Sequence, residues 1–193
     1  MKMQTARMAR VIGCEIVTVD ALHPATGPPR PEVAKWFGSE GPFFEHYNAM
    51  ENEDGTYNYV GVEKSLAALN ETVEKLGPFD VALGFSQGAT LLTMYIASLE
   101  KAGKQLPFRA AMLLCGTFPR CKTPIFDYPN KILSLHVFGE TDPLRPKSEE
   151  LAKSYYQEGT RTVMSHKGGH MPPSGGQDAC IQRIKEWMKI NGF

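Results

Sequence analysis

A single serine stands between two glycines in the stretch FDVALGFSQGAT, residues 79–90. The stretch contains the pattern G-x-S-x-G, with glycines at Gly84 and Gly88 and the serine at Ser86. This pattern is typical of a nucleophilic serine on a sharp turn between a strand and a helix. It also arises by chance in about one chain in twenty of this length, where the serine is an ordinary turn residue. The apolar residues on both sides can supply the strand and the helix, and they favour Ser86 as a nucleophile.

The turn and the helix after it predict how this serine would be assisted. We expect a turn so tight that neither Gly84 nor Gly88 leaves room for a side chain. The helix that follows directs its first backbone amides toward negative charge that develops during a reaction. The backbone N–H of Gln87 is therefore the predicted oxyanion-hole donor.

A serine hydroxyl is a weak nucleophile at its free pKa, so it needs a histidine base and an acid that orients the base. In α/β-hydrolases these residues follow in the order serine, acid, histidine. Two of the five histidines precede the serine, and His136 lies inside an apolar run typical of a strand. His170 lies in a loop between a glycine pair and a proline pair, and it is favoured over His166 as the base. The spacing of these two histidines also fits half of a zinc site, but no second ligand cluster accompanies it, so no metal is predicted.

The acid should leave the end of a strand between the serine and the histidine. The stretch ILSLHVFGETDP, residues 132–143, gives an apolar strand, a glycine and then Asp142 before a proline. Glu140 is the rival acid, and Asp142 also fits a plain turn residue or helix cap. The order strand, loop, acid, strand, loop, histidine favours Asp142 as the acid of the triad.

Short β-rich runs alternate with segments of helical periodicity, which predicts a mainly parallel central sheet with helices on both faces. The expected strands are residues 14–19, 81–84, 110–115, 132–138 and 162–165. The expected helices are residues 1–12, 62–76, 91–99, 149–158 and 181–188. The predicted serine, acid and histidine would then follow three different strands of one sheet.

The region 22–59 differs from the rest, because it is rich in proline at its start and in aromatic residues without a clear period later. A connection of this length in a compact domain is often functional. It is interpreted as a lid or a substrate-side wall, with Phe43, Phe44 and Tyr47 lining an apolar acyl or aromatic-ester pocket. The alternative is an irregular surface loop, whose aromatic side chains only pack it against the rest of the protein.

Length and charge limit the organisation and the partners. The 193 residues suit one domain, residues 1–193. Lysine plus arginine equals aspartate plus glutamate, 21 each, so we expect a small-molecule partner and neither nucleic acid nor an anionic membrane surface. No apolar stretch approaches the ~20 residues that cross a bilayer. The oligomeric state is left open.

The cysteines bear on the compartment. The chain has four, without a C-x-x-C pair, and no secretory leader is expected before them. They are expected to be buried thiols in a reducing compartment, so a cytoplasmic protein is predicted. The members of this set are Cys14, Cys115, Cys121 and Cys180.

Beyond these spacings, the sequence resembles a known family, the FSH-type serine hydrolases. The similar stretches are DALHP at 20–24, YVGVEKSL at 59–66, GFSQGA at 84–89, FGETDP at 138–143 and GGHMPP at 168–173. They run in family order over nearly the whole chain. The resemblance implies an α/β-hydrolase fold, hydrolysis of carboxylic esters or thioesters, no cofactor, and Ser86, Asp142 and His170 as the triad.

One part of the family pattern is not found. Members of the family begin with a strand that ends in a His-Gly loop, whose amide is a second oxyanion donor, and this sequence holds no His-Gly pair. An N-terminally truncated form of the fold is therefore expected. Losing one oxyanion donor slows catalysis by about a hundredfold to a thousandfold. Two interpretations stay open: a serine hydrolase, or a catalytically weak or inactive hydrolase-fold protein that binds a small molecule or partner in the same cleft.

Overall fold

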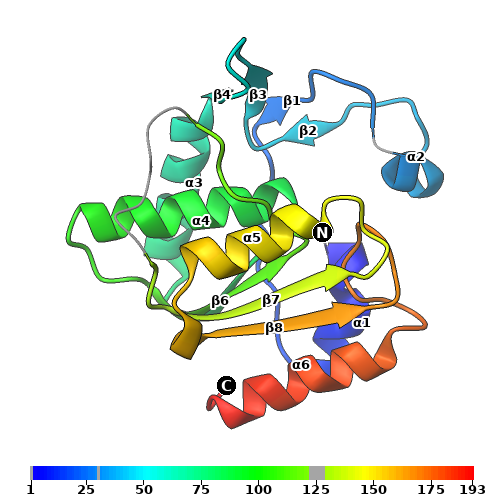
Figure 1. Ribbon diagram of the computed structural model, residues 1–193, viewed down its shortest axis with the longest axis vertical. Helices are drawn as coiled ribbons and strands as arrows, with labels where there is room; N and C mark the ends of the chain where they lie inside the picture. Colours follow the sequence, from blue (N-terminus) through cyan, green and yellow to red (C-terminus); the bar gives the residue numbers. More distant parts are fainter. Residues whose placement is uncertain (1, 30, 122–128) are drawn as a thin grey trace.

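Four parallel strands form the central sheet, in the spatial order β5-β6-β7-β8 (Figure 1). The computed structural model describes residues 2–29, 31–121 and 129–193. The strands of the sheet are β5 (Phe79–Phe85), β6 (Phe108–Leu114), β7 (Leu133–Gly139) and β8 (Arg161–His166). Parallel strands place their carboxyl ends on one edge of a sheet, so the loops after these strands meet at that edge.

Helices cover both faces of the sheet (Figure 1). On one face lie α4 (Gln87–Lys101) and α5 (Arg145–Tyr155), with α3 (Val62–Leu76) packed against α4. On the other face α1 (Lys2–Ile12) and α6 (Asp178–Ile190) pack side by side. The α/β class expected from the alternating pattern is confirmed.

Strand β6 shows how the two layers are joined. It is apolar at nearly every position, as expected of a strand buried on both faces. Ala110, Met112 and Leu114 lie in the core cluster shared with α1 and α6. Ala111 and Leu113 lie in the cluster shared with α4. Because successive side chains of a strand point to opposite faces, this one strand holds both helical layers in register with the sheet.

The predicted strand at residues 14–19 is wrong. Residues 14–20 have no regular secondary structure and join none of the described sheets. A strand is held by hydrogen bonds to a neighbouring backbone, and within the described part of the chain β5 pairs only with β6. The β propensity of the stretch CEIVTV cannot replace that missing partner. The other four predicted strands and the five predicted helices are confirmed, the helix at 62–76 with the same ends and the others with shifted ends. Met1, the first residue of the predicted N-terminal helix, lies outside the described residues.

Residues 22–59 contain short paired elements. Strand β1 (His23–Pro24) pairs with β2 (Phe44–Glu45), and α2 (Pro31–Phe37) lies between them in the sequence. Strand β3 (Asn48–Glu51) forms a hairpin with β4 (Tyr57–Val60). Figure 1 shows both pairs beyond α3 and α4, at the end of the molecule away from α6. Elements this short carry no readable periodicity, which is why the sequence indicated only a loop.

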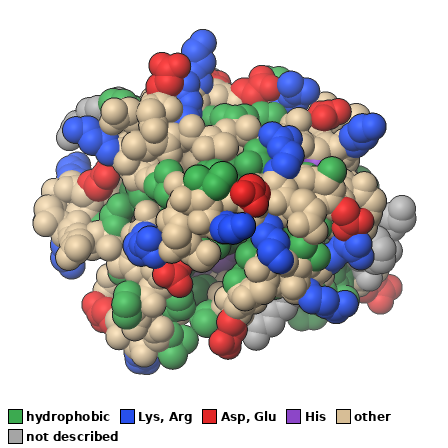
Figure 2. Space-filling model, turned by 90° about the horizontal axis from the view of Figure 1, so that it is seen from below, with side chains coloured by type: hydrophobic (Ala, Val, Ile, Leu, Met, Phe, Trp, Pro, Cys, Tyr) green, Lys and Arg blue, Asp and Glu red, His purple; other side chains and the backbone are tan. Residues whose placement is uncertain are grey.

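Figure 2 shows one face of the surface, on which lysine and arginine side chains are interspersed with aspartate and glutamate. This face therefore carries no extended field of one sign. Within the described ranges, no helix has both the length and the apolar character needed to cross a membrane. The expectation of buried cysteines holds for Cys115 and Cys180 but is wrong for Cys14, which is exposed, and for Cys121, which is only half-buried.

His136 occupies the core, as its place in an apolar strand suggested. Its side chain is 2% exposed, lies 3.3 Å from the hydroxyl of Ser134 through Nε2, and packs edge-on against the ring of Tyr156. Burial, with a smaller contribution from the charge of Arg161, lowers the pKa of His136 to about 3. The imidazole is therefore neutral in the folded protein at pH 7.

This burial predicts a defined loss of stability in acid. The folded-state pKa of His136 lies below the unfolded value of about 6.5, so the unfolded chain binds the extra proton between these values. Above about pH 6.5 the protonation of His136 does not lower the free energy of unfolding. Below that pH the free energy of unfolding falls toward pH 3, by up to about 1.4 kcal/mol per pH unit from this one group. We expect urea unfolding at pH 7, 6, 5 and 4 to show a smaller pH slope for His136→Gln than for the wild type. Equal slopes in the two proteins would contradict the assignment.

Candidate active site

Ser86 sits in a strained turn between β5 and α4. Its backbone has φ 51° and ψ −117°, and its N–H donates to the carbonyl of Leu114 at 2.8 Å. A positive φ is costly for a residue with a side chain, about 1–3 kcal/mol, and it persists only where the surroundings impose it. Strand β5 on one side and the buried helix α4 on the other impose it here. The turn lifts the side chain above the sheet edge, as the motif predicts.

The two motif glycines differ in the space around them. A Cβ at Gly84 would lie 2.5 Å from the Cα of Ala89, so glycine is required where the helix folds back onto the strand. A Cβ at Gly88 would meet nothing closer than Nε2 of His46 at 3.7 Å, which is an ordinary contact. The expectation of no room is confirmed for Gly84 and wrong for Gly88, because Gly88 points out of the turn rather than into it.

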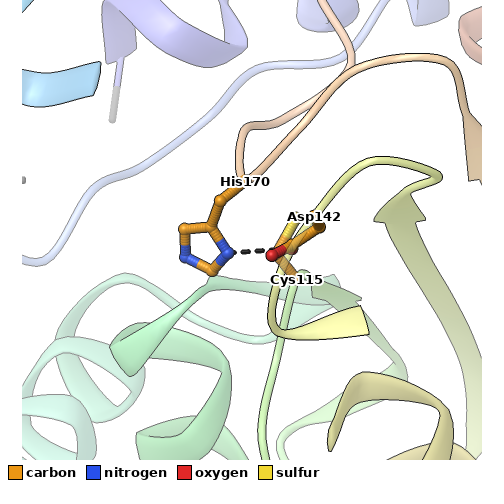
Figure 3. A group of neighbouring side chains, drawn as sticks. All are labelled: Cys115, Asp142 and His170. Carbon is orange, nitrogen blue, oxygen red and sulfur yellow. Dashed lines mark hydrogen bonds and ion pairs between the residues drawn. The ribbon is translucent and has the colours of Figure 1, made fainter. Parts of the chain in front are cut away.

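The structure joins Ser86, His170 and Asp142 in one chain of hydrogen bonds. His170 Nε2 lies 2.8 Å from the hydroxyl oxygen of Ser86. His170 Nδ1 lies 2.8 Å from Oδ2 of Asp142, as Figure 3 shows. The other carboxylate oxygen of Asp142 accepts the N–H of Leu144 at 2.8 Å. With Nδ1–H donating to the buried carboxylate, Nε2 is left as an acceptor that faces the serine hydroxyl. This geometry suits transfer of the serine proton to the imidazole.

The loop after β7 and the loop after β8 are fastened to each other by their backbones. The N–H of Glu140 donates to the carbonyl of His166 at 2.7 Å, and the N–H of Thr141 donates to the carbonyl of Gly168 at 3.2 Å. A Cβ at Gly139 would overlap the carbonyl oxygens of Gly168 and its neighbour. Gly139 therefore permits the approach that brings the acid to the histidine. Sequence reasoning did not single it out, although it is the one glycine between the strand and the predicted acid.

The two rival residues lie close by with other partners. Glu140 is exposed and accepts a hydrogen bond from the hydroxyl of Ser165 at 3.2 Å. His166 is 3% exposed, its Nδ1 accepts the N–H of Gly168 at 3.1 Å, and its Nε2 lies 3.0 Å from the carbonyl of Met171. Burial lowers the pKa of His166, which keeps the ring neutral. The ring spans the base of the loop that carries His170 and holds that loop in shape.

A segment of residues 44–51, here called the strap, crosses the start of α4. The side chain of Gln87 fastens it, because its Oε1 accepts the N–H of His46 at 2.7 Å and its Nε2 donates to the carbonyl of Tyr47 at 2.9 Å. The hydroxyl of Ser65 adds a hydrogen bond to the carbonyl of His46. Burial lowers the pKa of His46, so a neutral imidazole lies beside Gly88, two residues from the serine. The sequence predicted a role only for the backbone of Gln87.

The three aromatic residues predicted to line a substrate wall differ in exposure. Phe44 is 55% exposed, Phe43 is half-buried, and Tyr47 is 3% exposed. Tyr47 packs in a core cluster with Leu91 and Met94 of α4, and burial raises its pKa. Tyr47 therefore anchors the strap to α4, and its buried ring is not available to line a substrate pocket. A substrate-side surface stays a prediction for Phe43 and Phe44.

Cys115 joins the buried group around the acid. One ligand atom each from Cys115, Asp142 and His170 lies within 4.8 Å of the others, so these side chains are near enough to share a metal ion (Figure 3). Two of the three, Asp142 and His170, are already hydrogen-bonded to each other. Burial, with the nearby charge of Asp142, raises the pKa of Cys115 to about 12, which disfavours the thiolate that a metal prefers.

The parallel sheet, its helical layers and the strained serine between β5 and α4 define the class of protein: it is an α/β-hydrolase. The family model described as "Serine hydrolase (FSH1)" matches residues 1–179. The chain belongs to this family of serine hydrolases. The resemblance noted in the sequence is thereby confirmed.

Two similar proteins carry the name esterase. Esterase OVCA2 of Homo sapiens is 34% identical over 174 residues, which are 83% of this chain and 76% of that protein. Esterase C25G4.2 of Caenorhabditis elegans is 36% identical over 167 residues, 78% of this chain and 67% of that protein. A carboxylesterase structure from Mesorhizobium loti has a TM-score of 0.63 at 17% identity, covering 97% of this chain and 82% of that chain, which shows the shared fold. Family and relatives together identify the chain as an enzyme of the serine hydrolase type.

The clamp on the strap can be tested through Gln87. Its two hydrogen bonds contribute about 1–3 kcal/mol together, so Gln87→Ala should free the strap while keeping the backbone N–H at position 87. We expect the amide of His46 to exchange its hydrogen with solvent faster in this variant, as measured by hydrogen–deuterium exchange.

The matched control is Gln87→Glu, which keeps an acceptor for the N–H of His46 but lacks the donor to Tyr47. Its exchange rate at His46 should lie between those of the wild type and Gln87→Ala. Unchanged protection of His46 in Gln87→Ala would show that the strap is held by other contacts.

Proposed function

We propose that this chain hydrolyses a carboxylic ester or thioester through a triad of Ser86, His170 and Asp142 and an acyl-enzyme intermediate. The observation that carries the proposal is the continuous pair of 2.8 Å contacts from the serine hydroxyl through both ring nitrogens to the carboxylate. Ser86, Asp142 and His170 each follow a different strand at one edge of the sheet. An ordinary turn serine or a core histidine would not need to be brought together in this way.

In the proposed reaction the serine attacks first. His170 Nε2 takes the hydroxyl proton as the oxygen of Ser86 bonds to the carbonyl carbon. Asp142 stabilises the imidazolium that forms and keeps the ring oriented. The tetrahedral intermediate then collapses, and the imidazolium gives its proton to the departing alcohol or thiol. Water, deprotonated by the same histidine, attacks the acyl-enzyme and releases the carboxylic acid and the free serine.

The start of α4 supports the oxyanion. Gln87 is the first residue of that helix, and the first amides of a helix have no acceptor within the helix. In the proposed mechanism the N–H of Gln87 donates to the carbonyl oxygen as it becomes negative. The same residue fastens the strap, so the oxyanion donor and the adjacent segment share one anchor.

An apolar acyl or aryl group is the substrate feature that the surroundings favour. The ring of Phe85 lies 5.4 Å from that of His170, and Phe44 is exposed on the strap that Gln87 holds. Burial lowers the pKa of His46, which adds a neutral ring beside the start of α4. We therefore infer a small-molecule ester or thioester with an apolar acyl or aryl group as the substrate.

Labelling with a fluorophosphonate, read by intact mass, tests the nucleophile. We expect one adduct on the wild type and none on Ser86→Ala or His170→Ala, because the serine needs the base to react. Hydrolysis of a short p-nitrophenyl ester should fall by about a thousandfold or more in both variants. The comparison variant is His166→Asn, which removes the rival histidine but keeps a side-chain oxygen that can accept the N–H of Gly168, so the folded variant should still be labelled.

Two results would overturn the triad. One is an adduct on Ser86→Ala, and the other is loss of labelling in folded His166→Asn together with normal labelling of His170→Ala. A folded wild type that binds esters saturably without adduct or turnover would instead support the binding protein left open by the sequence.

The substrate surface is tested by Phe44→Ala. Since the ring is exposed on the strap, its removal should leave folding unchanged and raise KM for p-nitrophenyl esters of longer acyl chains more than for the acetate. We expect the difference to grow by about 0.8 kcal/mol for each methylene group that the ring covers. Measured kcat/KM across acetate, butyrate, hexanoate and octanoate gives the profile. An identical profile in wild type and variant would remove Phe44 from the substrate surface.

A further inference from the structure

The loop that carries His170 makes a very tight turn. His170 lies at its centre, and the N–H of Met171 donates across the turn to the carbonyl of Gly169 at 2.9 Å. A three-residue turn of this kind closes with a single internal hydrogen bond. The direction in which the imidazole of His170 points therefore depends on contacts that hold the chain on either side of the turn.

The ring of His166 contacts the chain on both sides of His170. Its Nδ1 accepts the N–H of Gly168 at 3.1 Å, and its Nε2 lies 3.0 Å from the carbonyl oxygen of Met171. The side chain of His166 is 3% exposed. A Cβ at Gly168 would lie 2.9 Å from Nδ1, so the ring can approach this closely because residue 168 is glycine. One buried side chain thus spans the turn from residue 168 to residue 171.

These two hydrogen bonds define the tautomer of His166. The N–H of Gly168 can only donate, so Nδ1 is unprotonated, and the carbonyl of Met171 can only accept, so Nε2 carries the proton. His170 is held in the opposite tautomer, because its Nδ1–H donates to Asp142. A protonated ring at His166 would turn a second N–H toward that of Gly168. The observed contacts therefore require a neutral His166.

The backbone of the same segment is tied to the loop that carries the acid. The carbonyl of His166 accepts the N–H of Glu140 at 2.7 Å, and the carbonyl of Gly168 accepts the N–H of Thr141 at 3.2 Å. The peptide groups of residue 168 are thus held at the N–H by the ring of His166 and at the carbonyl by the acid loop. A shift of the ring would move the turn relative to Asp142.

We propose that His166 is a positioning residue, whose neutral Nε2–H tautomer holds the turn at residues 168–171 and so directs His170 toward Ser86 and Asp142. The inference rests on the proposed function, because the direction of His170 affects catalysis only if His170 is the base. Protonation of His166 converts Nδ1 from an acceptor to a donor and breaks its hydrogen bond to Gly168. Acid therefore lowers activity at this residue as well as at the base itself.

The groups around His166 favour the neutral ring at pH 7. Burial is the largest effect and lowers the pKa of His166, while the hydrogen bond to Met171 and the negative charges of two carboxylates act in the opposite direction. The positioning tautomer is therefore populated above this lowered pKa and lost below it. The titratable groups nearby are Asp142 and Glu140 in the loop after β7, Lys167 and His170 in the loop after β8, and Cys115 after β6, with the neutral amide of Gln177 on the side of α6.

Two variants separate the hydrogen bonds of His166 from its bulk. His166→Phe keeps a ring and loses both hydrogen bonds, whereas His166→Asn keeps an oxygen that can accept the N–H of Gly168. We expect kcat for p-nitrophenyl acetate to fall about a hundredfold in His166→Phe, because a small displacement of the base is enough to do so, with KM unchanged. The loss should be smaller in His166→Asn. Fluorophosphonate should label both folded variants, at rates that follow the same order.

The matched control is His136→Phe, which replaces a second buried histidine, 2% exposed in the neighbouring strand β7. Its ring contacts Ser134 and Tyr156 and none of the three triad residues. This variant should lower the melting temperature, as His166→Phe does, and leave kcat unchanged. Wild-type kcat in folded His166→Phe, or an equal loss of kcat in the two phenylalanine variants, would overturn the positioning role.

The tautomer and the acid response give readouts that lost stability alone does not change. In NMR correlation spectra of the imidazole nitrogens at pH 7, we expect the proton of His166 on Nε2 and that of His170 on Nδ1. At pH values where melting curves show both proteins folded, kcat/KM should fall more steeply toward acid in the wild type than in His166→Asn. A proton on Nδ1 of His166, or identical pH profiles, would contradict the proposal.

The outcome is separable from that of the proposed function. If Ser86→Ala abolishes labelling and folded His166→Phe keeps the wild-type kcat, the triad stands and the role of His166 falls. If Ser86→Ala is still labelled, the triad itself falls, and the positioning role of His166 falls with it.

Discussion

The contact between the loop after β7 and the loop after β8 is the constraint on which the candidate site depends. Gly139 and His166 are register partners at the carboxyl ends of their strands, and the absence of a side chain at Gly139 lets the carbonyls of residues 168 and 169 close onto it. The backbone bonds from Glu140 and Thr141 then lock the two loops together. Only with this spacing does Asp142 come within 2.8 Å of the ring of His170. A larger residue at 139 would separate acid and base without touching either.

Strain is concentrated at the same edge of the sheet. Ser86 and Cys115 follow neighbouring strands and both have positive φ, at a cost of about 1–3 kcal/mol each. The apolar strands and α4 behind them hold the conformation, because the core that they form cannot relax around a single turn. The buried sheet thus stabilises two unfavourable turns, and the loops beyond it direct their side chains to one point.

The sequence predicted those parts of the structure that depend on local order. Apolar strands, a helix stripe such as that of α3, and the residues Ser86, Asp142 and His170 follow from composition, spacing and chain order. What depended on a distant partner was not predictable. Residues 14–19 look like a strand but lack a neighbouring backbone, Gly139 matters only because another loop closes onto it, and the side chain of Gln87 has meaning only where the strap crosses it. Family resemblance supplied chemistry but none of these contacts.

Gln87 connects the chemistry to its surroundings through two different groups. Its backbone begins α4, where an amide can face a developing oxyanion, and its side chain holds the N–H of His46 and the carbonyl of Tyr47. Rotation of α4 or displacement of the strap would therefore alter both the proposed oxyanion donor and the apolar residues of the strap. Tyr47 is itself packed on α4, so the strap contacts the helix through a buried ring as well as through Gln87. In the proposed enzyme, substrate preference can then change through exposed residues such as Phe44 while the sheet, the strained turns and the hydrogen bonds among Ser86, His170 and Asp142 stay as they are.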